Sequence, residues 1–368
     1  MKVLYIGHMR ERSGFSIAAE NYVKALVAAG VDMVVRNIKL SPTNHPSSQF
    51  IAELEKKSLD GCTHVIQHVL AHHMSYVSGM KNIGLFVYDL NNPSFCEWDR
   101  YLSCMDEVWV PNEENLDMLD VTTYYVPHAC DTTRYSRQYA PLDIPEIGGT
   151  FNLYTIADIS KRKNLRDIIV AFHSEFHANE PVNLILKVSK FGVTPEQTVE
   201  IVTSDLNRVK TDLKLYPNIN DYRPEILITH SLTDDQIGSI HTSGHCYVNT
   251  SHGEAWGYPM MDAWAYGNHI IYYNNGKMYN YLKAAQNSFE LVHPILCHSE
   301  PCYGYSDTFP QLGSAREKWL SSNVPGLMRH MRNAYETWLT NPNKLVHRDY
   351  EEYSYERVGE TMKGLLSA

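Results

Sequence analysis

Short apolar runs alternate with amphipathic stretches along almost the whole chain of 368 residues. Runs such as KVLYIG at 2–7 and DMVVRNI at 32–38 have the length and residue types of strands. Between them, FSIAAENYVKALVAAG at 15–30 carries apolar residues at helical spacing. Parallel strands cannot be joined by tight turns and need crossover connections, which are usually helices. The alternation therefore predicts an α/β fold with parallel sheets.

The alternation occurs twice, and a stretch rich in proline and glycine, YAPLDIPEIGG at 139–149, separates the two series. Because a chain of this length usually divides into more than one core, we expect two Rossmann-like domains at 1–145 and 146–345, facing each other across a cleft. The other strand-like runs are 63–69, 82–89, 106–111 and 122–127 in the first series and 151–158, 183–189, 225–231, 245–251 and 269–275 in the second.

Composition narrows the class of protein. The net charge is −10 without a long basic run, which is a poor match to a protein that coats nucleic acid. The first residues, MKVLYIGHMRERSG, read as a strand followed by charges rather than as a signal peptide. No run approaches the roughly 20 apolar residues of a membrane-spanning helix, and the seven scattered cysteines are typical of reduced thiols. We expect a soluble cytoplasmic protein without membrane insertion.

Two carboxylates stand eight positions apart in TSHGEAWGYPMMDAWAYG at 250–267. Pro259 suits the first turn of a helix, which places Glu254 in the loop after a strand and Asp262 one turn inside the helix. Backbone amides at such a helix start favour an anion such as phosphate. Glu254 is then placed to accept hydrogen bonds from sugar hydroxyls and Asp262 to reach a ribose. The alternative is an acidic loop followed by a carboxylate that interacts with the helix dipole.

The same stretch resembles S-x-x-E-x-[FWY]-G-x-P-x-x-E-A-x-A-x-G, the signature of family 4 retaining glycosyltransferases, which have the B-type two-domain fold (GT-B). The resemblance implies that Glu254 is catalytic and that Trp256, Gly257, Tyr258 and Asp262 bind the donor. Asp262 stands where the family usually has Glu, so its side chain is one methylene shorter. The matching residues are Ser251, Glu254, Trp256, Gly257, Pro259, Asp262, Ala263, Ala265 and Gly267.

A second stretch, IADISKRKNLRDIIVAF at 156–172, resembles the segment that carries the family's phosphate-binding cations. Lys163 aligns with the family lysine, and Asp158 occupies the position of the family's usual arginine, five residues earlier. We therefore expect the neighbouring Arg162 to share the cationic role. A solvated KRK run is the alternative, although cations at a helix start are disfavoured by the helix dipole. Because cations are unfavourable at this position by themselves, their presence favours an anionic ligand that they bind.

Weaker resemblances extend over the rest of the chain. The stretch around Gly14 resembles the family's glycine loop, where the backbone approaches the donor phosphates. The stretch around Ser231 and Leu232 resembles the family's turn that passes the nucleotide base. VPHACDTTRYS resembles the family's P-N-G-V-D-x-x-x-F, with His128 and Ala129 replacing Asn and Gly. The final segment resembles one that crosses back onto the first domain, so we expect 346–368 to form a helix packed there. The resemblance implies that 1–145 form the acceptor domain and 146–345 the nucleotide-sugar donor domain.

The resemblance implies a retaining hexosyl- or pentosyltransferase that moves a sugar from a nucleotide-diphosphate sugar to an acceptor hydroxyl. It also implies front-face attack, in which a donor phosphate oxygen takes the acceptor proton. Because the leaving group is a phosphate, Lys163, Arg162 and backbone amides can stabilise its charge without a metal or cofactor. Asp89, in VYDLNN, is a candidate for orienting the acceptor, or a turn-forming Asp.

The acceptor is not identified by the sequence, and neither is an oligomeric state. A saccharide, a lipid-linked glycan, a protein and a small molecule are all open. The opening stretch also resembles phage-encoded glycosyltransferases, some of which modify DNA bases, so DNA is an alternative acceptor. Two alternative functions are a sugar-nucleotide epimerase or phosphorylase of the same fold and a non-catalytic nucleotide-sugar-binding protein.

Two histidine-containing stretches resemble metal sites only in part. His64, His68 and His72 have helical spacing, but THVIQHV is β-branched and predicts a strand with His64 and His68 on one face. HPILCHSEPC at 293–302 lacks the C-x-x-C pairs of tetrahedral zinc sites. We therefore expect no metal site.

Overall fold

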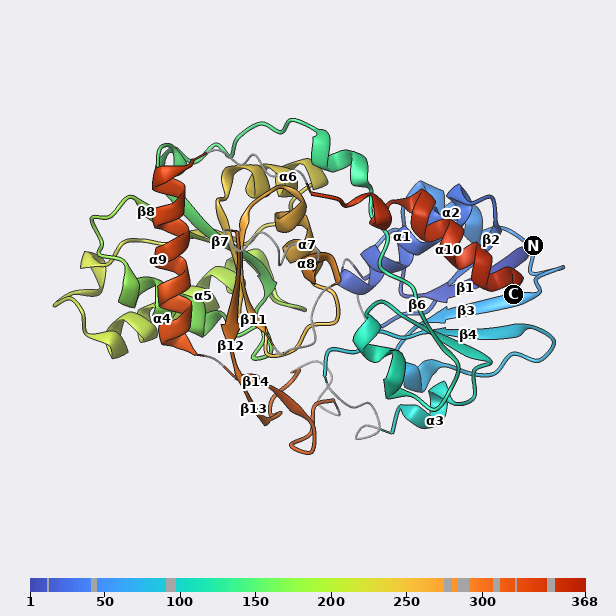
Figure 1. The fold of residues 1–368 in the computed structure, drawn as a ribbon. Coiled ribbons are helices and arrows are strands. Elements are labelled where there is room, and N and C mark those ends of the chain that lie inside the picture. The colour runs from blue at the N-terminus through green and yellow to red at the C-terminus, as the bar shows by residue number, and fades with distance from the viewer. Residues whose placement is uncertain are drawn as a thin grey trace. The chain divides into compact units, whose positions relative to one another are not determined.

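The computed structural model describes residues 1–11, 13–40, 45–90, 97–274, 280–283, 291–306, 312–321, 323–342 and 348–368 (Figure 1). These residues form two compact units: unit 1 comprises Met1–Arg134 and Asp349–Ala368, and unit 2 comprises Tyr135–Arg348. The chain passes from one unit to the other after Arg134 and after Arg348, whereas we placed the boundaries at 145 and 345. Residues after Arg134 join unit 2 because they bond to it, as the hydroxyl of Tyr135 does to Asp262 (2.8 Å).

Unit 1 contains a six-stranded, wholly parallel sheet in the order β2-β1-β3-β4-β5-β6. This arrangement confirms the parallel α/β architecture predicted for the first series. Its strands are β1 (Lys2–Gly7), β2 (Asp32–Asn37), β3 (His64–His68), β4 (Lys81–Leu85), β5 (Glu107–Val110) and β6 (Thr123–Tyr125), and its helices are α1 (Gly14–Ala28), α2 (Gln49–Glu55), α3 (Asp99–Leu102) and α10 (Tyr355–Ser367).

The C-terminal helix α10 returns to unit 1 and packs against α1, as predicted (Figure 1). The two helices approach closely at Gly359, where a Cβ atom would lie 2.1 Å from the carbonyl oxygen of Ala25. No larger residue fits between these backbones without moving one helix. Val358, Met362 and Leu366 bury the apolar face of α10 in the core of unit 1.

Unit 2 contains a second parallel sheet, in the order β12-β11-β10-β7-β8-β9. A two-stranded antiparallel hairpin, β13–β14, follows it. The strands are β7 (Phe151–Asp158), β8 (Val182–Ser189), β9 (Ile226–Ile228), β10 (Cys246–Asn249), β11 (His269–Asn274), β12 (Val292–Leu296), β13 (His298–Pro301) and β14 (Lys318–Ser321), and the helices are α4 (Leu165–Glu175), α5 (Pro195–Leu213), α6 (Asp234–Ser243), α7 (Tyr258–Ala265), α8 (Asn280–Lys283) and α9 (Val324–Thr340).

Local sequence explains where the helices of unit 2 begin. Thr194 caps α5 by accepting from the amide of Gln197, and Pro195 occupies the first turn, where its missing N–H is not needed. β8 is buried along almost its whole length because helices cover both faces of a parallel sheet. Its apolar residues, with those of α4, α5 and α9, form the core of unit 2.

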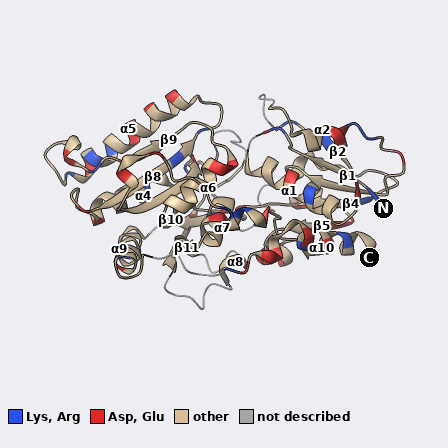
Figure 2. Ribbon diagram, turned by 90° about the horizontal axis from the view of Figure 1, so that it is seen from above, with Lys and Arg blue, Asp and Glu red and all other residues tan. Residues whose placement is uncertain are grey.

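Positions of Lys and Arg lie interspersed with positions of Asp and Glu along the ribbons of both units (Figure 2). The net charge of the chain is −10. Within the described residues, no helix is both long and apolar enough to cross a membrane.

The core of unit 1 includes three buried histidines, His8, His68 and His128, which are at most 3% exposed. Burial lowers the pKa of all three, because a charged imidazole loses its hydration there, and it lowers the pKa of His128 to about 3. Their folded-state pKa values therefore lie below the ordinary value near 6.5.

We predict that stability falls as the pH drops below about 6.5, because the unfolded chain then binds protons that the folded histidines cannot. His128→Asn removes one of these groups and introduces the residue that the family pattern has at this position. The free energy of unfolding of this variant should depend less steeply on pH, by up to about 1.4 kcal/mol per pH unit between pH 6.5 and the acid transition. Urea unfolding at several pH values measures both slopes, and equal slopes would contradict the prediction.

Candidate functional site

Neighbouring strands of unit 2 bring together the two stretches that resemble family motifs, 156–172 and 250–267. β7 leads into the turn at 159–164 before α4, and β10 leads into the loop at 250–257 before α7. Since both strands run parallel, their carboxyl ends lie at the same edge of the sheet, where α/β sheets bind ligands. At this edge Lys163 Nζ forms an ion pair with Glu254 Oε2. The structure thus pairs the predicted cation with the predicted carboxylate.

Hydrogen bonds hold the two loops in register behind this ion pair. The backbone N–H of His252 donates to the carbonyl of Arg162 (2.8 Å), and the hydroxyl of Thr250 donates to the carbonyl of Asn164 (2.9 Å). In return, Nη1 of Arg162 donates to the carbonyl of Gly253 (2.7 Å) and lies 3.9 Å from Glu254 Oε2. Backbone and side chain of residue 162 therefore both fix the loop that carries Glu254.

Two cations and two carboxylates lie together at this edge. Lys163 and Arg162 lie beside Glu254 and interact with the charge of Asp158. The side chains of Lys163, Arg162 and Glu254 are only 17%, 19% and 13% exposed. Partial desolvation raises the pKa of Asp158 at the end of β7, while Lys163 and Arg162 act in the opposite direction. Glu254 Oε1 has no hydrogen-bond partner among the described residues. The site therefore offers positive charge together with an acceptor oxygen.

The β13–β14 hairpin supports the same loops, and the sequence motifs did not predict this contact. The backbone N–H of Leu320 donates to the carbonyl of His252 (2.9 Å), and His252 Nδ1 bonds to the carbonyl of Leu320. The ring of His252 stacks on Trp319, with centroids 4.4 Å apart. Lys161 lies 3.1 Å from the ring centroid of Tyr303, which follows β13. Neither hydrophobic periodicity nor a sequence motif could predict these contacts of the hairpin, because they depend on packing between segments that are distant in sequence.

Asp262 lies in the second turn of α7, as predicted, and it is 6% exposed. The hydroxyl of Tyr135 donates to its Oδ1 (2.8 Å), and Nε2 of the buried His241 lies 3.9 Å from Oδ2. Burial raises the pKa of Tyr247, and the charges of Glu254 and Asp262 raise it further. The Tyr247 phenol is therefore within electrostatic reach of both carboxylates. The sequence did not identify Tyr135, His241 or Tyr247.

The residues between the two carboxylates support the loop. Trp256 is 3% exposed, its indole N–H donates to the sulfur of Met261, and its carbonyl accepts from Tyr281 (2.7 Å). In this structure the indole therefore packs inside unit 2. Gly257 caps α7 in the left-handed region at φ 76°, and a Cβ atom there would lie 3.3 Å from Cγ of Glu254. Tyr258 opens α7 and is half-buried.

The remaining predicted site residues lie elsewhere. Gly14 is the exposed first residue of α1, and Asp89 occupies a bend four residues after β4, so both belong to unit 1. Ser231 and Leu232 lie between β9 and α6 in unit 2. Since β8 separates β9 from β7, they follow a strand two places from the one that leads to Lys163. Their proposed ligand contacts stay predictions.

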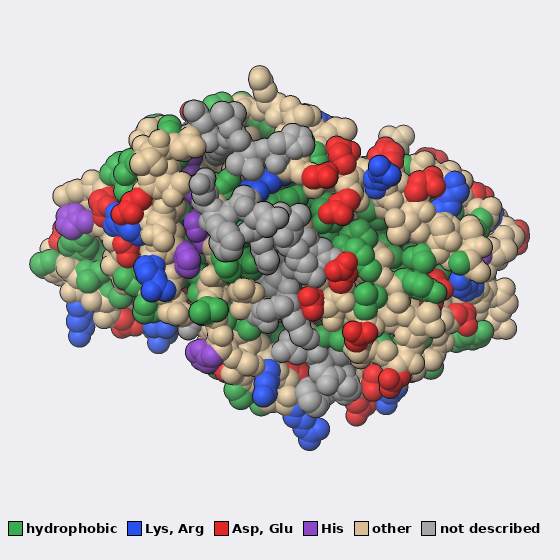
Figure 3. All heavy atoms as spheres, in the orientation of Figure 1, with side chains coloured by type: hydrophobic (Ala, Val, Ile, Leu, Met, Phe, Trp, Pro, Cys, Tyr) green, Lys and Arg blue, Asp and Glu red, His purple; other side chains and the backbone are tan. Residues whose placement is uncertain are grey.

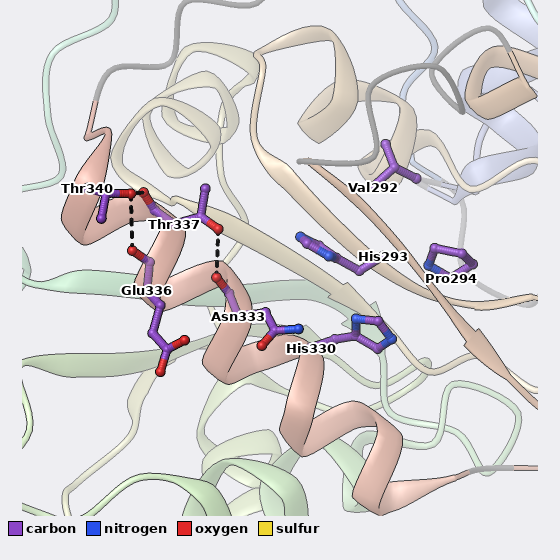
Figure 4. A pocket seen from close by; sticks show the side chains of 8 residues that line it. All are labelled: Val292, His293, Pro294, His330, Asn333, Glu336, Thr337 and Thr340. Carbon is purple, nitrogen blue, oxygen red and sulfur yellow. Dashed lines mark hydrogen bonds between the residues drawn. The ribbon is translucent and has the colours of Figure 1, made fainter.

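No cluster of three or more potential metal ligands occurs among the described residues. His64 and His68 begin and end a strand, as predicted, and residues 293–302 run through β12 and β13. Histidine side chains appear on the face of unit 2 beside α9 (Figure 3). A pocket of about 640 Å³ lies there between β12 and α9, and His293, His330 and Glu336 are among its lining residues (Figure 4). It contains no residue of the predicted site.

Several solved structures resemble this chain over its full length, and three of them illustrate the likeness. Anabaena Alr3699/HepE in complex with UDP-glucose has a TM-score of 0.61 at 12% identity and matches 100% of this chain and 99% of its own. An E. coli structure described as trehalose-6-phosphate bound with UDP-2-fluoro glucose has a TM-score of 0.58 at 10% identity, with 100% and 99% coverage. Sucrose-phosphate synthase from Thermosynechococcus elongatus has a TM-score of 0.55 at 13% identity, with 100% and 98% coverage.

The fold is that of the B-type glycosyltransferases. No protein-family model matches the sequence, and no curated protein matches it. The B-type fold and the parallel sheet in each unit confirm the predicted α/β fold with two Rossmann-like units. At these identities the likeness concerns the fold, so activity has to be argued from the residues of the site.

We predict that Gly257→Ala destabilises the protein by about 1–2 kcal/mol, since a residue with a Cβ atom is disfavoured in the left-handed region. The added methyl group also presses on Glu254, so turnover should fall as well. Chemical denaturation measures the first effect and a sugar-nucleotide assay the second.

Gly14→Ala is the matched control for stability, because α1 is helical there and no atom lies within 4 Å of the added Cβ. This variant should unfold like the wild type. A similar loss of stability in both variants would show that the backbone conformation of Gly257 is not the cause.

Proposed function

We propose that this protein is a glycosyltransferase that transfers a sugar from a nucleotide-diphosphate sugar to an acceptor hydroxyl, with retention of the anomeric configuration. The observation that carries the proposal is the pairing of Lys163 with Glu254 at the ends of neighbouring strands. The B-type fold supports it, and solved structures of that fold include complexes described as containing UDP-glucose, or UDP and glucose.

The proposed chemistry requires stabilisation of the nucleotide diphosphate as it leaves. Lys163 has three ammonium donors, and Glu254 occupies one of them, so the others can donate to phosphate oxygens. Arg162 adds a second positive charge beside it. Fixed charges of this kind in a partly desolvated site stabilise developing negative charge without a metal ion.

Glu254 is proposed to hold the transferred sugar. Its Oε2 stays with Lys163, and Oε1 accepts from a sugar hydroxyl. Asp262 is proposed to bind the donor ribose, in which case the ribose shares this carboxylate with the Tyr135 hydroxyl. Because no metal enters this scheme, turnover should be measured with excess chelator present.

We predict that Lys163→Ala slows turnover of the nucleotide sugar by one to two orders of magnitude, the size expected for losing one charge-stabilising donor. Lys161→Ala is the matched control, because Lys161 lies in the same turn but faces Tyr303. Its turnover should stay near that of the wild type, and both variants should keep their melting temperatures within a few degrees.

The assay follows release of the nucleoside diphosphate and identifies the sugar product, starting with UDP-glucose and extending to other nucleotides. Wild-type turnover in Lys163→Ala, with intact folding, would place the phosphate site elsewhere. Epimerised sugar without transfer would instead support the epimerase alternative.

A further inference from the structure

Two buried histidines of unit 1 stand where neighbouring parallel strands end. His8 directly follows β1, and His68 is the last residue of β3, in register with Gly7. Both are almost fully buried, at 0% and 1% exposure. The carboxyl ends of such strands are where open α/β sheets bind ligands.

The hydrogen bond of His8 fixes its tautomer. Nδ1 lies 2.8 Å from the carbonyl oxygen of Ile38, and a carbonyl can only accept, so Nδ1 carries the proton. Burial lowers the pKa of His8, so the ring is neutral and Nε2 presents a bare lone pair. This Nε2 is buried and has no hydrogen-bond partner among the described residues.

His68 presents a second nitrogen of the same kind. Its Nδ1 lies 2.8 Å from the hydroxyl of Tyr5, which can donate or accept, so Nε2 can act as acceptor or donor. Nε2 of His68 is also buried without a partner among the described residues. A buried polar group without a partner destabilises the folded protein. A ligand or an ordered water can supply the missing hydrogen bonds to these two neighbouring nitrogens.

Aromatic neighbours connect this pair to the surface of unit 1. The ring centroid of Phe15 lies 6.0 Å from that of His8 and 5.6 Å from that of His68, and Phe15 is only half-buried. The exposed His73 lies 6.3 Å from His8. The cluster therefore extends from the core outward and includes an apolar ring beside polar nitrogens.

The electrostatics favour a neutral ligand. The charged or titratable groups that shift the pKa of His8 and His68 are other histidines and Glu11. Arg10, one residue before Glu11, forms an ion pair with Glu55. A phosphate or carboxylate would meet the lone pair of His8 and the charge of Glu11, whereas a hydroxyl group can donate to one nitrogen and accept from another.

We propose that His8 and His68 bind a hydroxyl group of a neutral saccharide, with Nε2 of His8 as acceptor and Phe15 against the apolar face of the sugar. This inference rests on the proposed function, for which it assigns the acceptor class: a neutral sugar.

Nitrogen-15 imidazole spectra of the full chain test the site directly, with a panel of neutral hexoses, pentoses and disaccharides as probes and glucose 6-phosphate as the anionic comparison. The free protein should show His8 protonated at Nδ1. A neutral sugar should shift the Nε2 resonance of His8, and the phosphorylated sugar should bind more weakly.

Two substitutions separate the atoms of His8. His8→Asn keeps a donor near the Nδ1 position but removes Nε2, so the affinity for the best sugar should fall roughly three- to tenfold. His8→Gln places an amide near the Nε2 position and should keep most of the affinity. His64→Asn, at the other end of β3, should bind the sugar as the wild type does, and melting temperatures identify any variant that fails to fold.

Three results would overturn the inference. In the first, His8→Asn binds sugar as tightly as the wild type. In the second, no sugar of the panel shifts the resonances of either histidine, which would mean that an ordered water satisfies Nε2. In the third, only an oligonucleotide with a 5-hydroxymethylated base produces a shift, which would make DNA the ligand. Transfer from nucleotide sugars to the sugars of the panel by the wild type tests the proposed transferase separately. Absence of transfer to any sugar that binds at His8 contradicts the transferase and not this site.

Discussion

The ion pair between Lys163 and Glu254 depends on the adjacency of β7 and β10 in a parallel sheet. The two residues are 91 positions apart in sequence, and the crossover topology places their loops at one edge. Bonds from His252 and Arg162 then hold the loops together. Without this adjacency, a lysine in a solvated turn and a glutamate in a polar loop would have no common function.

The burial of the Lys163–Glu254 ion pair and the charges beside it determine which ligand it can bind. A fully exposed ion pair contributes little, and a fully buried one loses much of its attraction to desolvation. Lys163 and Glu254 lie between these limits, at 17% and 13% exposure. With Arg162 alongside, the edge presents two cationic side chains whose N–H groups can donate to an anionic ligand such as a diphosphate. The hairpin stacks Trp319 on His252 and stabilises this arrangement.

Much of this architecture could be predicted from local sequence. Alternating strand and helix periods gave the two parallel sheets, and Pro259 and Thr194 marked helix starts because capping and first-turn preferences are local. The motifs also placed Lys163 and Glu254 at one site. Contacts set by packing between distant segments could not be predicted: the Tyr135–Asp262 bond, the hairpin under His252 and the burial of the Trp256 indole. The boundary at Arg134 belongs to the same class, since it depends on which unit the linker packs against.

The central claim is that Glu254 and Asp262 serve different parts of one nucleotide-sugar donor. Calorimetric titration of Glu254→Gln and Asp262→Asn with bare nucleoside diphosphates, UDP first, tests it most directly. Glu254→Gln should bind the nucleotide nearly as the wild type does, because the bare nucleotide lacks the sugar. Asp262→Asn should bind more weakly by about 1–3 kcal/mol, the range for a hydrogen bond to a charged group. Tyr135→Phe controls for the bond that Asp262 makes within the protein. Equal losses in both carboxylate variants, or no loss in either, would contradict the account.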